Sequence, residues 1–357
     1  MTHLWVRAES RPSEQRVGLT PEGARALIAR GFRVTVERSG ARAIGLAGYR
    51  DAGCEIAPEG SWPDAPGDAI VFGLKDLPDD GTPLRHRHVM FGHAYKGQPD
   101  GPRLLARFRA GGGTLYDLEY LVDGAGRRVA AFGYWAGYAG AAVGLKVWAA
   151  QQAGTLQGPA RIGVYDGRDS LLDDLRGDLV AGLSNGAEAP RVIVIGALGR
   201  VGTGAGDLAG ALGLSVTRWD MAETAHGGPF PEILDHEIFV NCILARPGVP
   251  VFVPREAITA PRRLTVIADV SCDPGSAYNP VPVYDHATSF DDPVIRVTAG
   301  PPPLDVTAID NLPSMLPVES SEDYAAQLLP ALERLDRIGA GVWGRAKAAF
   351  DEHSRDI

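Results

Sequence analysis

A glycine-rich turn after an apolar strand constrains the fold of this chain most strongly. Arg191–Ile195 is an apolar run, which is typical of a buried parallel strand. It leads into Gly196, Gly199 and Gly202, and an apolar helix is predicted at Gly206–Leu214. Glycine permits a sharp turn there and lets backbone N–H groups approach a pyrophosphate at a helix N-terminus. The pattern therefore predicts a dinucleotide-binding βα turn, with an ordinary glycine-rich turn as the alternative.

The next predicted strand ends at Asp220, 18 residues after Gly202. In dinucleotide-binding folds this position holds the carboxylate that binds the adenosine ribose hydroxyls. A carboxylate there repels a 2′-phosphate, so the sequence favours NAD over NADP as cofactor. Arg218 and His226 lie nearby and favour the opposite choice.

Strands and helices alternate along the rest of the chain. Strands are predicted at 4–7, 32–37, 68–73, 88–92, 215–219, 238–241 and 265–270, and helical segments at 24–30, 136–153 and 322–351. Such alternation predicts a parallel sheet with helices on both faces. Residues 155–190 are interpreted as a helical or surface insertion.

The length of 357 residues exceeds what one ordinary core supports, so two domains are expected. We predict an α/β fold with two Rossmann-like doubly wound domains and an inter-domain active-site cleft. Residues 1–135 with 320–357 are the predicted substrate or catalytic domain, and 136–319 the predicted NAD-binding domain.

The composition excludes several classes of function. A net charge of −9 argues against a nucleic-acid partner, and the basic cluster at Arg85–His88 is interpreted as a solvated loop. The three cysteines Cys54, Cys242 and Cys272 are too few and too widely spaced for a disulfide framework or a metal site. The N-terminus lacks a signal-peptide pattern and no stretch is long and apolar enough to span a bilayer, so we expect no membrane partner and a cytoplasmic protein.

Titratable side chains follow two predicted strands of the first domain. Lys75 comes after strand 68–73, and His93 and Lys96 come after strand 88–92. Ligands of open α/β sheets bind at the carboxyl ends of strands, so these side chains are candidates for a site. A solvated lysine and a structural histidine are the alternatives. Arg16 precedes a helix start, where it either binds a substrate carboxylate bidentately or forms a surface salt bridge.

Taken together, the motifs resemble the lysine-forming saccharopine dehydrogenases of fungi, in the alanine dehydrogenase/saccharopine dehydrogenase family. The resemblance covers nearly the whole chain and rests on Arg7–Glu9, Arg16 with Leu19–Pro21, Gly73–Lys75, His93–Lys96, Thr114–Glu119, Arg127–Gly133, Gly196–Arg200, Gly227–Phe230, Asn241–Ile243, Asp269–Ser271 and Asp310–Pro317.

This resemblance implies oxidative cleavage of saccharopine to lysine and 2-oxoglutarate with NAD, by a monomer or small homo-oligomer acting on a small molecule. It implies that Lys75 and His93 are the acid–base pair, with Arg16, Lys96, Glu119 and Arg128 binding the substrate. The cofactor positions that it implies are Gly196, Leu198, Gly199, Arg200, Val201, Gly202, Asp220, Thr224, Cys242, Ile243, Asp310 and Leu312. Val201 stands where fungal members can have a cysteine that faces the one at Cys242, so that disulfide is not expected here.

The expected mechanism needs a base for the secondary amine and an acid–base group for water and the carbinolamine. Lys75 is the candidate for the first role and His93 for the second. Lys75 acts as a base only if its pKa lies below the ordinary lysine value, and neighbouring Asp76 opposes this unless it points away or to a partner. Two alternatives remain: an opine-like imine reductase that joins lysine or another amine to a different keto acid, and a non-catalytic NAD(H)-binding regulator.

Overall fold

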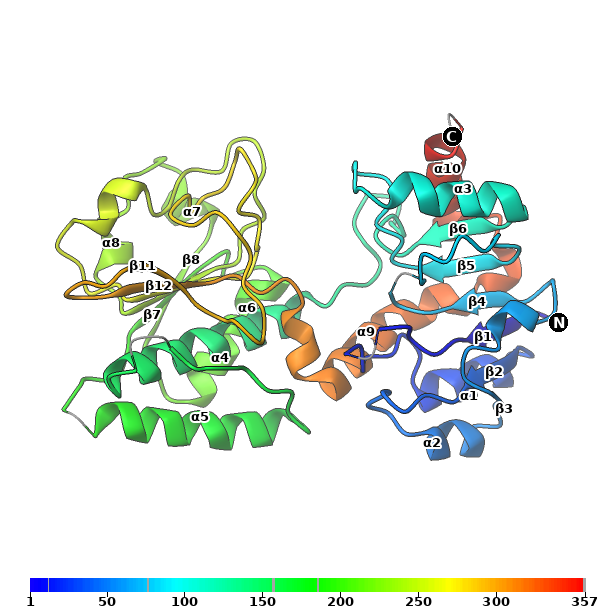
Figure 1. Cartoon of the computed structure of the whole chain (residues 1–357), viewed down its shortest axis with the longest axis horizontal. Helices are drawn as coiled ribbons and strands as arrows, with labels where there is room; N and C mark the ends of the chain where they lie inside the picture. The colour runs from blue at the N-terminus through cyan, green and yellow to red at the C-terminus, as the bar shows by residue number, and fades with distance from the viewer. Residues whose placement is uncertain (12, 76, 156–157, 185, 356–357) are drawn as a thin grey trace. The chain divides into compact units, whose positions relative to one another are not determined.

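The chain divides into two compact units in the computed structural model, which describes residues 1–11, 13–75, 77–155, 158–184 and 186–355. Unit 1 comprises Met1–Ala131 and Pro317–Ile357, and unit 2 comprises Phe132–Leu316 (Figure 1). Within the described residues each unit contains one six-stranded sheet. Asp76, expected to point away from Lys75 or to a partner, lies outside the described residues.

The sheet of unit 1 is parallel, in the order β3-β2-β1-β4-β5-β6. Its strands are β1 (His3–Val6), β2 (Arg33–Glu37), β3 (Glu55–Ala57), β4 (Ile70–Phe72), β5 (Arg87–Met90) and β6 (Thr114–Asp117). The helices of this unit are α1 (Pro21–Ala29), α2 (Leu46–Asp51), α3 (Gly101–Gly111), α9 (Pro317–Leu332) and α10 (Gly341–His353), with 3-10 turns at Trp62–Asp64 and Leu335–Arg337. Because β1 pairs with β2 on one side and β4 on the other, the strand order reverses between β1 and β4.

Local chemistry explains where the first helix begins and ends. The Thr20 hydroxyl accepts the Gly23 N–H at 3.2 Å, and Pro21 occupies the first helical position, which fixes a helical φ. The chain leaves α1 through Gly31, whose φ of +86° is open to glycine at little cost. The helix predicted at 24–30 is confirmed, and it runs from Pro21 to Ala29.

The sheet of unit 2 has the order β11-β12-β10-β9-β7-β8, parallel except for the edge strand β11. Its strands are β7 (Val192–Ile195), β8 (Val216–Trp219), β9 (Ile238–Asn241), β10 (Val266–Asp269), β11 (Ile295–Thr298) and β12 (Leu304–Thr307). The remaining elements are α4 (Gly133–Gln152), α5 (Arg168–Leu183), α6 (Arg200–Ala211), α7 (Met221–Thr224), α8 (Pro231–Leu234) and 3-10 turns at Arg255–Ile258 and Leu312–Met315. The predicted α/β class is thus confirmed.

Strand β7 lies between two hydrophobic layers. Val192 and Val194 belong to the cluster that includes residues of α4, α5 and α6, whereas Ile193 and Ile195 belong to the cluster on the other face. Alternate side chains of a strand point to opposite faces, so a strand covered on both sides reads as a continuous apolar run.

Two sequence predictions about local structure are wrong. The helix after the glycine turn begins at Arg200 rather than Gly206, because Gly199 serves as its N-cap and the chain enters the helix directly from the turn. Arg85–His88 is not a solvated loop, since β5 begins at Arg87 and both histidines are buried. His88 packs edge-on against Trp62 and Phe108, at ring-centroid distances of 5.1 and 5.4 Å.

The segment interpreted as an insertion contributes α5, which packs on α4. Lys146 of α4 binds the carboxylates of Asp174 and Asp178 at 2.5 and 2.7 Å. Burial would lower the pKa of Lys146, but these hydrogen bonds outweigh burial and raise it. None of the helices in the described part of the chain combines the length and apolar character needed to cross a membrane.

Helices α4 and α6 approach each other through glycines. A Cβ on Gly137 of α4 would lie 1.8 Å from the Val201 carbonyl oxygen, and a Cβ on Gly204 of α6 would lie 1.9 Å from the Tyr134 carbonyl oxygen. These distances are far below van der Waals contact with rigid backbone atoms, so the approach requires the absence of a side chain.

We predict that Gly137→Ala destabilises the protein by about 1–3 kcal/mol or more, the usual range for overpacking, because the helices must separate. The control is Gly177→Ala in α5, where an added Cβ meets nothing within 4 Å. Alanine should stabilise that helix by about 0.5–1 kcal/mol. Urea unfolding of both variants measures the difference, and equal effects would contradict the packing argument.

Candidate functional site

The carboxyl ends of four adjacent strands form one edge of the unit 1 sheet. Glu9 follows β1, Lys75 follows β4, His93 follows β5 and Glu119 follows β6. These strands are neighbours on either side of the point where the strand order reverses, between β1 and β4. Open α/β sheets bind ligands at such a switch point, so the sheet topology gathers the predicted residues at one edge.

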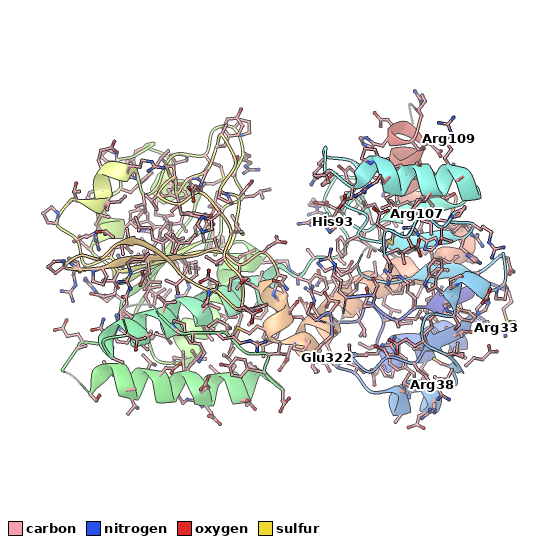
Figure 2. All side chains as sticks on the ribbon, in the orientation of Figure 1. Arg33, Arg38, His93, Arg107, Arg109 and Glu322 are labelled. Atoms are coloured by element: carbon pink, nitrogen blue, oxygen red, sulfur yellow. The ribbon has the colours of Figure 1, made fainter. Side chains whose placement is uncertain are left out.

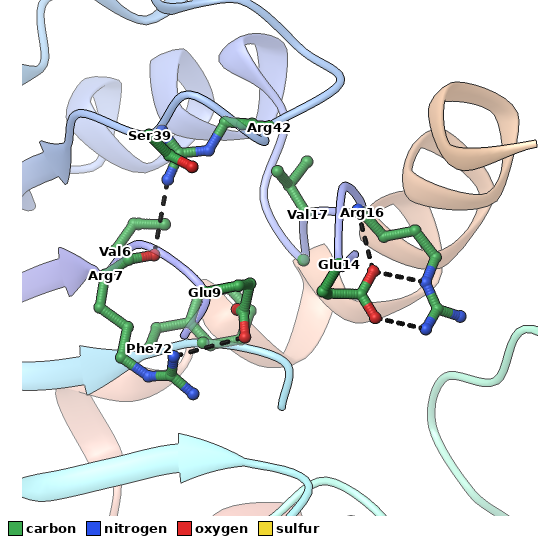
Figure 3. Close-up of a pocket in the computed structure, with 11 residues that line it drawn as sticks. Val6, Arg7, Glu9, Glu14, Arg16, Val17, Ser39, Arg42 and Phe72 are labelled. Carbon is green, nitrogen blue, oxygen red and sulfur yellow. Dashed lines mark hydrogen bonds and ion pairs between the residues drawn. The ribbon is translucent and has the colours of Figure 1, made fainter. Parts of the chain in front are cut away.

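Lys75 is held through its backbone by Arg7 and Glu9. The Glu9 carboxylate accepts the N–H of Leu74 at 2.6 Å and that of Lys75 at 2.9 Å. The buried Arg7 guanidinium donates to the Lys75 carbonyl oxygen and pairs with Glu9 at 3.3 Å (Figure 3). Gly73 leaves room for that guanidinium, since a Cβ there would lie 2.4 Å from the Arg7 Cζ.

His93 stands exposed after β5 (Figure 2), with a positive φ of 48°. Its ring stacks on Phe91 at a centroid distance of 6.2 Å and an interplanar angle of 18°. A positive φ is uncommon for residues other than glycine and is frequent at functional sites.

Asp117 ties the loops after β5 and β6 together. Its carboxylate accepts the Gly92 N–H at 3.2 Å and the Glu119 N–H at 2.9 Å. Burial raises the pKa of Asp117 to about 6, and the nearby charge of Glu119 acts in the same direction against these hydrogen bonds. Lys96 binds Glu119 at 2.6 Å, so two predicted substrate residues form an ion pair beside Asp117.

Arg16 forms a buried ion pair rather than a surface salt bridge. Its Nε and Nη2 donate to the two Glu14 oxygens at 2.8 and 2.6 Å, and both side chains are 4% exposed. Burial would raise the pKa of Glu14, but the hydrogen bonds and charge of Arg16 outweigh it and hold the pKa below its ordinary value. The pair lines a small pocket together with Arg7, Glu9 and Arg42 (Figure 3).

Tyr324 of α9 is a buried tyrosine close to the same residues. Its ring lies 6.1 Å from Phe91, the ring on which His93 stacks. Burial raises its pKa, and the charges of Arg128, Asp117 and Arg16 act on the same hydroxyl. The structure therefore brings the predicted substrate arginines Arg16 and Arg128 into electrostatic range of one buried group.

Sequence patterns alone did not single out Arg7, Glu9, Asp117 or Tyr324 as site residues. Arg7, Glu9 and Asp117 stand at the ends of β1 and β6, so the strand-end rule that selected Lys75 also applies to them. Tyr324 lies far along the chain in α9, and no local pattern marks it.

The glycine turn of unit 2 has the close backbone approach that a dinucleotide requires. Gly196 has a φ of +88°, and a Cβ on Gly202 would lie 2.1 Å from the Gly196 carbonyl oxygen. Helix α6 begins directly after the turn, with Gly199 as N-cap. The first N–H groups of a helix have no intrahelical partner, so they and the helix dipole can hold a pyrophosphate here.

Asp220 follows β8 beside this turn. Its Oδ2 accepts the Leu198 N–H at 3.0 Å, and with Glu223 it forms the capping box of α7. The Thr224 hydroxyl donates to the Asp220 carbonyl oxygen at 2.9 Å. Arg218, one of the two residues that would favour NADP, packs on α6, with its Nε 3.1 Å from where a Gly206 Cβ would be.

The remaining predicted cofactor positions have different surroundings. Cys242 and Ile243 follow β9 next to the turn, and a Cβ on Gly196 would lie 2.7 Å from the Ile243 Cδ1. Asp310 is exposed, whereas Leu312 is buried in the core cluster that includes residues of α4. Arg200 is exposed at the first position of α6, and Val201 is partly buried beside it.

A buried carboxylate that the sequence predictions missed supports the β9 end. Asp269 accepts hydrogen bonds from the Asn241 amide at 2.9 Å and the Tyr284 hydroxyl at 2.8 Å. Asn241 in turn accepts the Ile243 N–H at 3.2 Å. Burial raises the pKa of Asp269 against these hydrogen bonds. Among the described residues no cluster of three or more His, Cys, Asp or Glu is arranged to hold a metal ion.

Known proteins resemble the chain over nearly its full length. Residues 5–139 match the family described as alanine dehydrogenase/PNT, N-terminal domain. The saccharopine dehydrogenase [NAD(+), L-lysine-forming] of Yarrowia lipolytica is 48% identical over 98% of this chain and 97% of its own, and that of Schizosaccharomyces pombe is 46% identical over the same shares. A solved L-alanine dehydrogenase covers 99% of both chains with a TM-score of 0.68 at 18% identity, which shows a shared fold.

We predict that Asp117 makes stability depend on pH between about 4 and 6. In this window the folded carboxyl, with its pKa raised from 3.8 to about 6, binds more protons than the unfolded one, so stability falls as pH rises. At about 1.4 kcal/mol per pKa unit, the full cost above pH 6 is about 3 kcal/mol. Asp117→Asn lacks this ionisation but loses a hydrogen-bond acceptor at every pH.

Urea unfolding at pH 4 and pH 7 checks this prediction. The free energy of unfolding of Asp117→Asn relative to wild type should rise by up to about 3 kcal/mol between the two pH values. Exposed Asp51 is the control, and the stability difference of Asp51→Asn should be nearly constant. A constant difference for Asp117→Asn as well would contradict the raised pKa.

Proposed function

The chain belongs to the L-lysine-forming saccharopine dehydrogenase family, and we propose that Lys75 and His93 are the acid–base pair of its reaction. The protein is an oxidoreductase that acts on the CH–NH bond of saccharopine with NAD and releases L-lysine and 2-oxoglutarate. The observation that carries this function is the high identity to fungal relatives of that name over 98% of the chain. The arrangement of Lys75 and His93 on neighbouring strand ends supports the proposed roles.

NAD fits the glycine turn of unit 2. Glycine at 196 and 202 leaves the backbone approach free of Cβ atoms, and Asp220 lies beside the turn as a ribose ligand. When bound, NAD accepts the hydride from the substrate carbon that carries the secondary amine. The protein's part is to orient the substrate and to move protons.

Lys75 removes the proton of the secondary amine in the proposed mechanism. Its position after β4 brings it within electrostatic range of the buried carboxylate of Glu14. Glu9 accepts the backbone N–H of Lys75, and Arg7 donates to its carbonyl oxygen. These two contacts fix the backbone of Lys75 and do not involve its side-chain amine. Proton transfer demands such fixed placement, because a base must lie within hydrogen-bond reach of its proton.

His93 activates water and returns a proton to the departing nitrogen. Histidine suits both steps, because its ordinary pKa lies near neutrality and its ring can accept and donate. The exposed position of His93 gives water access, and the ring stacked on Phe91 keeps a defined orientation.

Arg16, Arg128 and Lys96 bind the carboxylates of saccharopine in this proposal, with Glu119 orienting Lys96. Saccharopine joins two amino-acid skeletons and carries three carboxylates, so a site for it needs several cations. Arginine can bind a carboxylate bidentately, which suits the exposed Arg128. The Nε and Nη2 of Arg16 already donate to Glu14, so Arg16 contributes its charge to the substrate rather than that pair of donors. Glu14 and Glu119 hold two of these cations in place by ion pairs of 2.6 Å.

No feature favours the two alternative functions. An opine-like imine reductase would share this fold, but the fungal relatives carry the name of saccharopine dehydrogenase. A regulator without catalysis would have no need of Lys75 and His93.

NADH formation from saccharopine and NAD by the purified chain, followed by NADH oxidation with lysine and a panel of keto acids, tests the function directly. Turnover with another keto acid but not 2-oxoglutarate would overturn it.

We predict that Lys75→Met lowers kcat by at least about 100-fold, the range expected for loss of a general base. NADH affinity, measured by fluorescence titration, should change less than about twofold, because the cofactor turn belongs to unit 2. Lys347→Met is the control, since Lys347 pairs with Asp351 on the surface of α10. Near-normal turnover of Lys75→Met would show that Lys75 is not the base.

We predict that Asp220→Ser shifts the cofactor preference toward NADP by about tenfold or more in kcat/KM, or about 1.4 kcal/mol. Serine remains a good N-cap for α7, but the charge that repels a 2′-phosphate is gone. Asp207→Asn on α6 removes one charge from the same unit and should leave the preference unchanged. Steady-state rates with each cofactor measure the ratio, and an unchanged ratio for Asp220→Ser would contradict its role.

A further inference from the structure

We propose that Glu9, paired with Arg7, is a positioning residue that fixes Lys75 for proton transfer. This inference rests on the proposed role of Lys75 as the base. Glu9 touches no reacting atom in this scheme: it acts on the peptide backbone of Lys75, and Lys75 acts on the substrate.

The β ladder ends just before Lys75. Phe72 is the last residue of β4, and the Gly73 N–H still reaches the Val89 carbonyl oxygen at 3.1 Å. The next two N–H groups, of Leu74 and Lys75, donate to the two oxygens of Glu9, at 2.6 and 2.9 Å. Buried or partly buried backbone groups need such partners, so one carboxylate replaces a neighbouring strand at this point.

The other side of Lys75 is held by Arg7. Its Nη2 donates to the Lys75 carbonyl oxygen, and its Nη1 donates to the Ala8 carbonyl oxygen at 3.0 Å. Both polar backbone groups of Lys75 are therefore bound to charged side chains from the end of β1, 66 and 68 residues earlier in the chain. The peptide of a candidate base is fixed on both sides by one ion pair.

Charge makes Glu9 and Arg7 dependent on each other. The Arg7 side chain is 1% exposed and that of Glu9 10%, and their ion pair measures 3.3 Å. A buried guanidinium without its carboxylate is costly, and a charged acceptor binds N–H groups more strongly than a neutral one. Both the negative charge and the two oxygens of Glu9 are thus needed at this position.

Glu9→Gln tests the proposal, because it keeps the shape and removes the charge and one acceptor. The amide nitrogen of the new side chain would face a backbone N–H, so the Lys75 peptide loses a hydrogen bond. We expect kcat with saccharopine to fall about 10- to 100-fold, as a misplacement of about 1 Å costs about 100-fold in rate. The limb of the pH–kcat profile assigned to Lys75 should shift, while NADH affinity stays within about twofold.

Two further variants separate positioning from a general structural role. Glu9→Asp keeps the charge and should recover part of the lost kcat. In the double variant Lys75→Met with Glu9→Gln, the second change should cost less than about twofold beyond Lys75→Met alone, because Glu9 acts through Lys75. Exposed Glu59, which follows β3, is the matched control, and Glu59→Gln should leave kcat and its pH profile unchanged.

The outcomes distinguish this inference from the proposed function. Near-normal turnover of Lys75→Met overturns the role of Lys75 and with it the positioning scheme. Loss of turnover in Lys75→Met with wild-type kcat and pH profile in Glu9→Gln overturns only the role of Glu9. The role of Glu9 is also overturned if the kcat losses of Lys75→Met and Glu9→Gln multiply in full in the double variant and the pH profile of Glu9→Gln does not shift. That result would show that Glu9 acts independently of Lys75.

Discussion

Where a strand of a parallel sheet ends, the backbone N–H groups that follow it have no neighbouring strand to bind. At the candidate sites of both units, carboxylates accept hydrogen bonds from these groups. Glu9 accepts two N–H groups after β4, and Asp117 accepts one after β5 and one after β6. In unit 2, Asp220 accepts the Leu198 N–H of the glycine turn, and Asp269 supports the ends of β9 and β10. The loops that carry the proposed chemistry are shaped by these acceptors.

The pKa of a buried carboxylate depends on how its hydrogen-bond donors balance the cost of burial. Asp117 and Asp269 have raised pKa values because burial outweighs their hydrogen bonds. Glu14 has a lowered pKa because Arg16 adds a full charge to its hydrogen bonds. The difference follows from the partner: neutral donors compensate part of the desolvation, whereas a buried guanidinium reverses it.

The sequence predicted those features that depend on spacing along the chain. The glycine turn, the positions of most strands and the strand-end placement of Lys75 and His93 follow from local pattern and from the general topology of parallel sheets. The hydrogen bonds of Arg7 and Glu9 with the Lys75 backbone join segments more than 60 residues apart. They therefore depend on which strands are neighbours in the sheet. The burial of His86 and His88 was missed for a related reason, since their polar character suggested solvent while β5 places them in the core.

The two proposed sites use backbone and side chains in different ways, and this determines what each tolerates. The turn at Gly196 and Gly202 requires residues without a side chain, since a single Cβ on Gly202 would lie 2.1 Å from a carbonyl oxygen. Any substitution there displaces the backbone that a pyrophosphate would meet. The strand ends of unit 1 depend instead on charged side chains held by specific hydrogen-bond partners. A substitution there can keep the shape of the side chain while it removes the charge, as in Glu9→Gln or Asp117→Asn. Isosteric substitutions therefore probe proton transfer at that edge, whereas at the glycine turn the size of the side chain is the variable that matters.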